Sequence, residues 1–194
     1  MSFDLAHLPW LLPVPTDFRL RCRNIEALES GWGPALRGLA QHALNDSNLM
    51  MLSRTLHNVR AKAGGAIPAL QTFSLGIISN ATTKLVAPAL TATALRYGIN
   101  LEIVEAEFNQ VMQAAVSPDS KVISRNPDAI MFMLDHNAFQ SLGSGLNSDS
   151  AAAIEYLAGL RDGLRQHFKG ALIFQSVPCP PDPFFGSYDI LHNM

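Results

Sequence analysis

Polar residues follow three short apolar runs in this sequence, and their types suit the binding or activation of a carbonyl group. They are, in chain order, Ser79, Asn80, Thr82, Asn109, Gln110, Asp135, His136 and Asn137. The apolar runs are typical of buried strands in a parallel sheet, where ligands gather beyond the carboxyl ends of the strands. We therefore take these eight residues as the candidate site.

Ser79 is the candidate nucleophile, because it stands at a sharp junction between an expected strand and an expected helix. A serine at such a junction is expected to be exposed, and backbone N–H groups at a helix start can stabilise an oxyanion. The alternative is that Ser79, Asn80 or Thr82 only caps the following helix. Asn80 and Thr82 are otherwise expected to bind ligand.

The Asp135-His136-Asn137 sequence offers a carboxylate, a base and an amide after the third strand. Asn137 is the candidate oxyanion donor, and His136 supplies an imidazole group, which often serves as a general acid or base. Asp135 and His136 are neighbours in sequence, so their side chains diverge and do not form a ready-made relay; both are expected to bind ligand. The alternative is that all three are turn residues that bond their own backbone. Asn109 and Gln110 either bind ligand or lie on a solvated face.

The elements that must position these residues predict an α/β fold. Strands are expected at residues 73–78, 101–104, 129–134 and 171–174, and helices at 84–97, 108–115 and 150–168. This alternation predicts a three-layer parallel sheet. Residues 1–70 predict an extended segment and a helical lead-in packed on the main domain, with Asp46 and Ser47 as caps of a helix through residue 62. Residues 71–194 are expected to form the main domain, cut before its last strand.

Composition excludes several classes of protein. The chain has 194 residues, 48% of them hydrophobic and 15% charged, with a net charge of −2, which does not favour nucleic-acid binding. Pro13 and Pro15 interrupt the apolar start, so we predict neither signal peptide nor membrane span and place the chain in the cytoplasm. Cys22 and Cys179 lie far apart, and no metal or other cofactor is predicted.

Arg19, Arg21 and Arg23 form the one basic cluster and alternate with Leu20 and Cys22. In an extended segment, this spacing would put the three arginines on one face. That face is predicted to bind an acidic partner, or to be a solvated strand edge.

Five segments in order resemble the N-terminal region of FkbH-like proteins, over about residues 70–190. They are residues 77–83 (IISNATT), 108–110 (FNQ), 117–120 (SPDS), 126–135 (NPDAIMFMLD) and 175–186 (QSVPCPPDPFFG). The resemblance implies an SGNH-hydrolase-like (flavodoxin-like) domain, normally followed by a HAD-type phosphatase domain. It also implies a role in loading a glyceryl-type three-carbon unit onto an acidic acyl carrier protein, in polyketide or surface-polysaccharide biosynthesis. The Asp-x-Asp-x-Thr motif of HAD phosphatases is absent from this sequence.

The comparison with SGNH hydrolases also implies how the site would work. Their Gly-Asp-Ser block falls at residues 78–80, their Gly-x-Asn block falls near residues 135–137, and their Asp-x-x-His block would lie beyond residue 194. A serine without its base loses most of its activation. We therefore expect a domain that binds the carrier protein or its acyl-pantetheine arm. The alternatives are an active esterase or acyltransferase that uses Ser79, and a structural or oligomerisation module.

Overall fold

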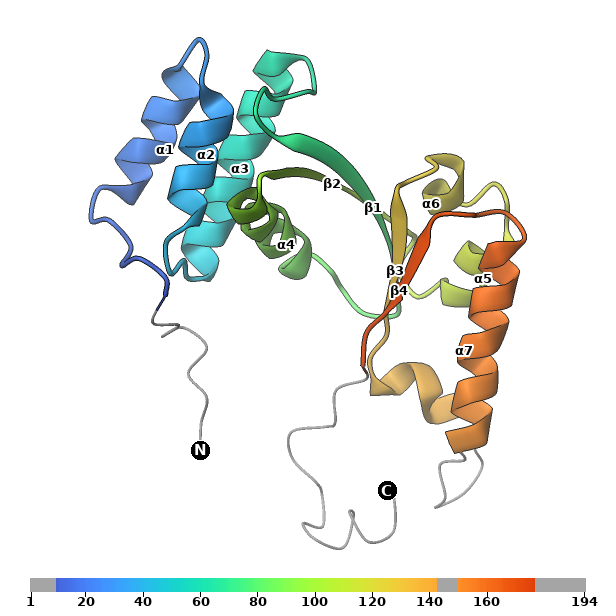
Figure 1. Ribbon diagram of the computed structural model, residues 1–194. Coiled ribbons are helices and arrows are strands. Elements are labelled where there is room, and N and C mark those ends of the chain that lie inside the picture. The colour runs from blue at the N-terminus through green and yellow to red at the C-terminus, as the bar shows by residue number, and fades with distance from the viewer. Residues whose placement is uncertain (1–9, 143–149, 177–194) are drawn as a thin grey trace, which may run out of the picture. The chain divides into compact units, whose positions relative to one another are not determined.

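The structure is a computed structural model that describes residues 10–142 and 150–176. Figure 1 shows the elements. The longer helices are α1 (Phe18–Ala27), α2 (Trp32–Ala40), α3 (Asp46–Ala63), α4 (Val86–Ala94) and α7 (Ser150–Arg165). The short ones are η1 (Leu95–Tyr97), α5 (Val111–Val116), α6 (Lys121–Ser124) and η2 (His136–Leu142). The strands are β1 (Gln71–Ser79), β2 (Ile99–Glu105), β3 (Ala129–Met133) and β4 (Ala171–Phe174).

The four strands form one sheet in the order β2-β1-β3-β4. β1 pairs with β3, and β3 with β4, in parallel, so that Leu75 lies opposite Ala129 and Ser79 opposite Met133. This is the order found at the start of flavodoxin-like sheets. The predicted α/β fold, a parallel sheet flanked by helices with a helical lead-in, is confirmed.

The contacts between residues in space divide the chain into two compact units. The first contains Met1–Phe73 and Thr83–Ile103, and the second contains Ser74–Thr82 and Val104–Met194. The sequence predicts a single boundary at residue 70. The contacts instead group α4, η1 and most of β2 with the lead-in helices, because α3 packs on α4 and α2 packs on η1.

The first unit has its own apolar core, built from α1, α2, α3, α4 and η1. Leu36, Leu52, Leu56 and Leu95 are fully buried in it. The N-cap of α3 is Asn45, not Asp46 or Ser47 as predicted, because the Asn45 side chain accepts a hydrogen bond from the Asn48 backbone N–H.

The predicted extended segment around the arginine cluster is wrong, because residues 18–27 form the helix α1. Phe18, Cys22 and Ile25 are its buried residues, at a spacing of four and three that fits one helix face. Successive helical residues are rotated by about 100°, so Arg19 and Arg23 share a face and Arg21 lies on roughly the opposite side. Arg21 pairs with Asp17 at 2.8 Å.

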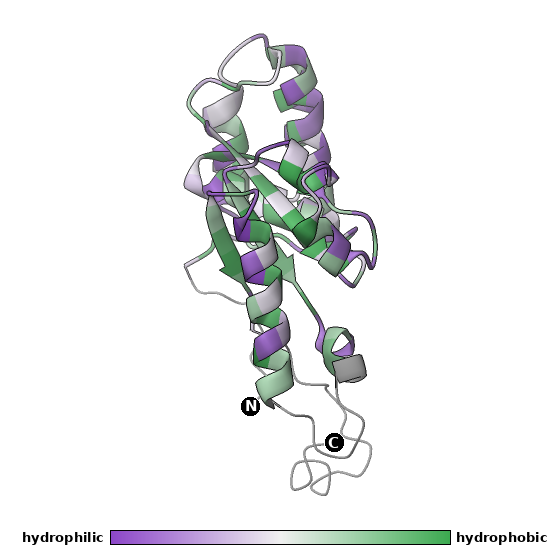
Figure 2. Cartoon of the chain, turned by 90° about the vertical axis from the view of Figure 1, so that its right-hand side faces the viewer, coloured by the Kyte–Doolittle hydropathy of each residue, from purple (hydrophilic) through white to green (hydrophobic). Residues whose placement is uncertain are grey.

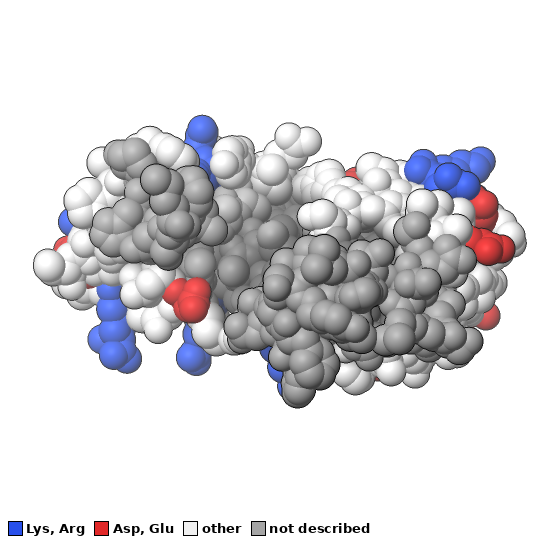
Figure 3. All heavy atoms as spheres, turned by 90° about the horizontal axis from the view of Figure 1, so that it is seen from below, with Lys and Arg blue, Asp and Glu red and all other residues white. Residues whose placement is uncertain are grey.

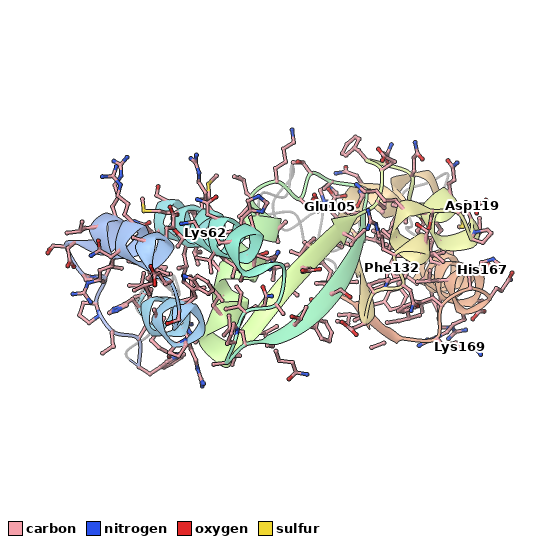
Figure 4. The ribbon with its side chains drawn as sticks, turned by 90° about the horizontal axis from the view of Figure 1, so that it is seen from above. Lys62, Glu105, Asp119, Phe132, His167 and Lys169 are labelled. Carbon is pink, nitrogen blue, oxygen red and sulfur yellow. The ribbon has the colours of Figure 1, made fainter. Side chains whose placement is uncertain are left out.

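The second unit has a core between its strands and the helices α5, α6 and α7. Ile78, Ile130 and Phe132 of the strands pack with Leu160 and Leu164 of α7. Figure 2 shows the strands as mostly hydrophobic and α7 as mixed, as expected for a covered sheet and an amphipathic helix. The Phe132 side chain, labelled in Figure 4, stacks on Phe174 with ring centroids 4.8 Å apart.

Gly76 shows why glycine is needed in this core. A Cβ on Gly76 of β1 would lie 2.4 Å from Val122 Cγ1 and 3.1 Å from Ile130 Cγ1. The absence of a side chain therefore lets α6 approach the sheet closely. Within the described ranges, no helix is long and apolar enough to cross a membrane.

Candidate functional site

The candidate site lies at the carboxyl ends of β1 and β3. After β1, the chain continues to β2 on one side of β1, whereas β3 and β4 lie on the other side of β1. The gap between β1 and β3 is therefore the topological switch point, where ligands of open α/β sheets bind. Ser79 ends β1, residues 80–82 follow it, and residues 134–137 follow β3, so the two segments lie at the same edge of the sheet.

Ser79 links the ends of the two strands through its hydroxyl group. Its Oγ donates to the Met133 carbonyl at 2.7 Å and accepts from the Ala81 backbone N–H at 3.0 Å. The side chain is buried, with 8% of the residue exposed, and not exposed as predicted. A nucleophilic serine donates its proton to a general base. Here the hydroxyl proton is directed at a backbone carbonyl, which cannot take it.

Asn80 and Asp135 form a reciprocal pair across the same strand ends. Asn80 Nδ2 donates to Asp135 Oδ1 at 2.5 Å, and the Asp135 backbone N–H donates to Asn80 Oδ1 at 3.0 Å. One N–H of the Asn80 amide is used in this pair, so its second N–H is available to another acceptor.

Asn137 completes the cluster from the other side of the carboxylate. Its backbone N–H donates to Asp135 Oδ1 at 2.9 Å, and its Nδ2 donates to Asp135 Oδ2 at 3.1 Å. This arrangement is an Asx-type turn, as in the turn alternative that the sequence left open. Asn137 is exposed, and its second amide N–H is not used by Asp135.

These hydrogen bonds lower the pKa of Asp135 below its ordinary value of 3.8. The largest cause is the hydrogen bond from Asn80, and burial opposes it by raising the pKa. The bonds from Asn137 and the charge of neighbouring His136 lower the pKa further. Asp135 is therefore an ionised acceptor around neutral pH, and not a proton donor.

The other predicted residues lie on loops at the strand ends. Ala106 in the loop after β2 donates to the Ile77 carbonyl at 2.9 Å, which holds this loop beside β1. Asn109 is exposed in the same loop and has a φ of 56°, in the left-handed region that asparagine tolerates. Gln110 precedes α5 without a side-chain cap, and Thr82 and His136 are exposed.

Gln175 is a site residue that the sequence reasoning missed. It directly follows β4, and its Nε2 donates to the Leu134 carbonyl at 3.1 Å. The sequence could have identified Gln175, because it is a polar residue directly after an expected strand, as the other candidate residues are. Among the described residues, no group of three or more His, Cys, Asp or Glu side chains could hold a metal ion.

Comparisons with known proteins connect this site to a family. The family described as "FkbH, N-terminal domain" matches residues 74–190, more than half of the chain. Part of that match, residues 177–190 with the proline-rich segment, lies outside the described residues. No curated protein matches the chain.

Two solved structures are similar to the chain. The first is the N-terminal part of the protein BF1531 from Bacteroides fragilis, which contains a phosphatase domain and was crystallised with Mg. It is 20% identical, with a TM-score of 0.57 over 76% of this chain, and this chain spans 37% of its length. The second is a cobalamin-binding protein from Desulfitobacterium hafniense DCB-2, 13% identical over 86% of each chain, with a TM-score of 0.37. Only the first supports the fold.

Proposed function

Because the chain belongs to the FkbH N-terminal domain family, we propose that it is the binding part of a protein that transfers a glyceryl-type three-carbon unit to an acyl carrier protein. In this proposal, an SGNH-hydrolase-like domain holds the carrier protein or its acyl-pantetheine arm at the ends of β1 and β3. We place this step in the cytoplasm, in polyketide or surface-polysaccharide biosynthesis.

The observation that supports binding over hydrolysis is the hydrogen bond from Ser79 Oγ to the Met133 carbonyl. This bond directs the hydroxyl proton to a group that cannot accept it, whereas an activated serine needs a base at that position. The amide groups of Asn80 and Asn137 each keep one N–H that Asp135 does not use. Such donors suit the carbonyl and amide oxygens of an acyl-pantetheine arm.

Phosphatase chemistry is assigned to another part of the proposed whole protein. The related Bacteroides fragilis structure contains a phosphatase domain, and the present chain spans 37% of it. A HAD-type phosphatase domain is therefore a natural partner in the same polypeptide. The present chain has no Asp-x-Asp-x-Thr motif with which to perform that chemistry.

Arg19 and Arg23 are the proposed contacts for an acidic carrier protein, since they share one face of α1. Arg21 leaves this set because it points elsewhere and pairs with Asp17. On the face seen in Figure 3, the Lys and Arg side chains of the described residues stand in small separate groups. The proposal therefore rests the attraction of the acidic partner on Arg19 and Arg23 of α1.

The test is a titration of the chain with a carrier protein in its apo, holo and glyceryl-loaded forms, followed by calorimetry. We expect the loaded form to bind about tenfold or more tightly than the apo form, a difference of about 1.4 kcal/mol. Asn80→Ala and Asn137→Ala should remove this preference, and Gln166→Ala, an exposed amide on another surface, should not. No binding to any form, or equal binding of all three, would overturn the proposal.

The arginine contacts are tested in the same titration. A double variant, Arg19→Glu with Arg23→Glu, should weaken binding to all three carrier forms, and Arg21→Glu is its matched control. Equal effects of the double variant and the control would show that the α1 face is not the contact.

An active esterase remains the second candidate, because the Ala81 N–H lies 3.0 Å from Ser79 Oγ at a strand end. Its test is labelling with a fluorophosphonate probe and peptide mass spectrometry. A stoichiometric adduct on Ser79 would favour this candidate over the binding function.

A further inference from the structure

The first unit has an open pocket of about 340 Å³, lined by Pro34, Arg37, Gly38, Gln41 and Ala69. The first four residues lie at helical spacings of three and four, so they form one face of α2 and its C-cap. Ala69 belongs to the turn that precedes β1. The volume lies at the lower end of the range for small-molecule sites. None of these residues takes part in the site at the strand ends.

Gly38 has no structural reason to be glycine. It lies in the last turn of α2, where glycine is among the least favourable residues. Its φ is not in the left-handed region, and a Cβ built on it would meet no atom within 4 Å. Gly33 on the same helix differs, because its Cβ would lie 2.2 Å from the Pro68 carbonyl oxygen. Glycine at position 38 therefore keeps open a space that no described atom fills.

The opposite wall of the pocket contains a strained residue. Ala69 has a φ of 68°, in the left-handed region that residues with a Cβ seldom adopt. Backbone strain of this kind concentrates where a ligand is held. The close approach of Pro68 to Gly33 fixes the turn against α2, so the position of this wall is determined by packing.

Arg37 supplies the charge in the pocket and is not needed to cap its helix. Arg96 bonds the last carbonyl group of α2 and one just beyond the helix, because its Nε donates to the Ala40 oxygen at 2.8 Å and its Nη2 donates to the His42 oxygen at 3.1 Å. Gln41 is held in place, because its Nε2 donates to the Arg96 carbonyl at 3.1 Å. The pocket thus joins an exposed guanidinium to a fixed amide.

We propose that this pocket binds the oxyanion group of a small molecule, a carboxylate or a phosphate, through the Arg37 guanidinium. The guanidinium presents N–H donors in a planar fork that matches either group. Gly38 admits the body of the ligand, and the Pro34 and Ala69 side chains cover its apolar part. The site goes beyond the proposed carrier-protein function and does not depend on it.

The test is a titration of the ¹⁵N-labelled chain with inorganic phosphate and, separately, with acetate, at constant ionic strength set with chloride. Saturable shifts are expected for the backbone amides of residues 37–41 and 69, with a dissociation constant on the order of millimolar. Saturation with phosphate alone would identify a phosphate-bearing ligand, and saturation with acetate alone a carboxylate-bearing one.

Two variants make the test specific. Arg37→Gln should abolish the saturable shifts, while the rest of its amide spectrum reports that it is folded. Gly38→Leu should fill the pocket and weaken binding about tenfold or more, although it raises the melting temperature by restoring helix propensity. Gly159→Ala is the control, since Gly159 in α7 is equally open and lies far along the chain. It should raise the melting temperature and leave binding unchanged.

The proposal is overturned if neither anion gives saturable shifts at the pocket amides. It is also overturned if folded Arg37→Gln, or folded Gly38→Leu, binds as the native chain does.

Discussion

Asn80 and Asp135 join the carboxyl ends of β1 and β3 by hydrogen bonds in opposite directions. The other end of the β1–β3 pairing, just before Leu75 and Ala129, is joined in the same way. Asp128 Oδ2 accepts from the Ser74 backbone N–H at 2.7 Å, and Ser74 Oγ accepts from the Asp128 backbone N–H at 3.1 Å. Polar side chains thus fix the register of the central strand pair at both of its ends.

The lowered pKa of Asp135 makes part of the stability dependent on pH. A carboxyl group whose folded-state pKa lies below its unfolded value stabilises the fold above the unfolded value, and this stability is lost as pH falls through the folded value. The free energy of unfolding should therefore decline as pH falls below about 4. In Asp135→Asn, that part of the decline should be absent, and stability at pH 7 should be lower by about 1 kcal/mol.

Urea denaturation at several pH values measures this effect. Asp119→Asn is the matched control, since Asp119 is an exposed carboxylate between α5 and α6 (Figure 4). The interpretation fails if both variants follow the native acid profile.

Ser79→Ala should lower stability, and both the variant and the native chain should be unreactive toward fluorophosphonates. The variant loses the bond to the Met133 carbonyl and leaves the Ala81 N–H without its acceptor. The expected loss is about 1–2 kcal/mol in the free energy of unfolding. Ser124→Ala, at an exposed position of α6, should change stability by much less. A Ser79→Ala variant as stable as the native chain would contradict the structural role of the hydroxyl.

Gly76→Ala should destabilise the second unit by overpacking. The added Cβ would lie 2.4 Å from Val122 Cγ1, so the sheet and α6 would have to separate. The expected loss is about 1–3 kcal/mol. A double variant with Val122→Ala removes the clashing methyl groups and should recover part of that loss relative to Val122→Ala alone. Thermal unfolding of the four chains completes this mutant cycle.

Asn100→Leu should destabilise the first unit. Asn100 is fully buried, and its Oδ1 accepts from Arg60 Nε at 3.0 Å and from Arg60 Nη2 at 2.5 Å. Burial lowers the pKa of Arg60, and neighbouring Glu102 opposes that effect. Replacing Asn100 leaves a half-buried cation without its main acceptor, with an expected loss of about 3 kcal/mol.

The matched variant is the double change Arg60→Met with Asn100→Leu. Removing both partners should restore much of the stability, as measured by urea denaturation. If the double variant is less stable than Asn100→Leu alone, Arg60 does not depend on Asn100 for its burial.

The sequence predicted the elements whose signals are local. β4 is predicted at residues 171–174, as observed. The helix predicted through residue 62 ends at Ala63, where Gly64 follows with a φ of 71°. Helix α6 was missed because four residues carry too little periodicity. The start of α5 was predicted three residues early, since the turn that contains Asn109 is itself rich in residues that helices tolerate.

The arginine cluster shows why a short alternating pattern can mislead. Residues 19–23 alternate charged and apolar side chains, which fits a strand, but Phe18, Cys22 and Ile25 fit one helix face over a longer window. The helical spacing of these three apolar residues was present in the sequence, and they are the residues that α1 buries. A pattern is therefore more reliable when its apolar positions, and not its charged ones, set the period.

The candidate site was located by its edge of the sheet but not by its contacts. The strand-end rule placed Ser79, Asn80, Asp135 and Asn137 together, and the structure does so. The hydrogen bonds among them could not be predicted. Ser79 lies opposite Met133, so an unchanged register would put Asn80 opposite the residue after Met133, whereas Asn80 bonds Asp135, one residue further on. That offset arises after the strands end, where no pattern applies.

The pairing of β1 with β3 joins residues that are 54 positions apart, which has a consequence during synthesis of the chain. At about 5–20 residues per second, a ribosome needs roughly 3 to 11 seconds to make the stretch from Ser74 to Asp128. Throughout that interval, the apolar residues Leu75, Ile77 and Ile78 of β1 have no β3 against which to be covered. The nascent chain thus exposes these apolar residues, a known source of aggregation, until β3 is made.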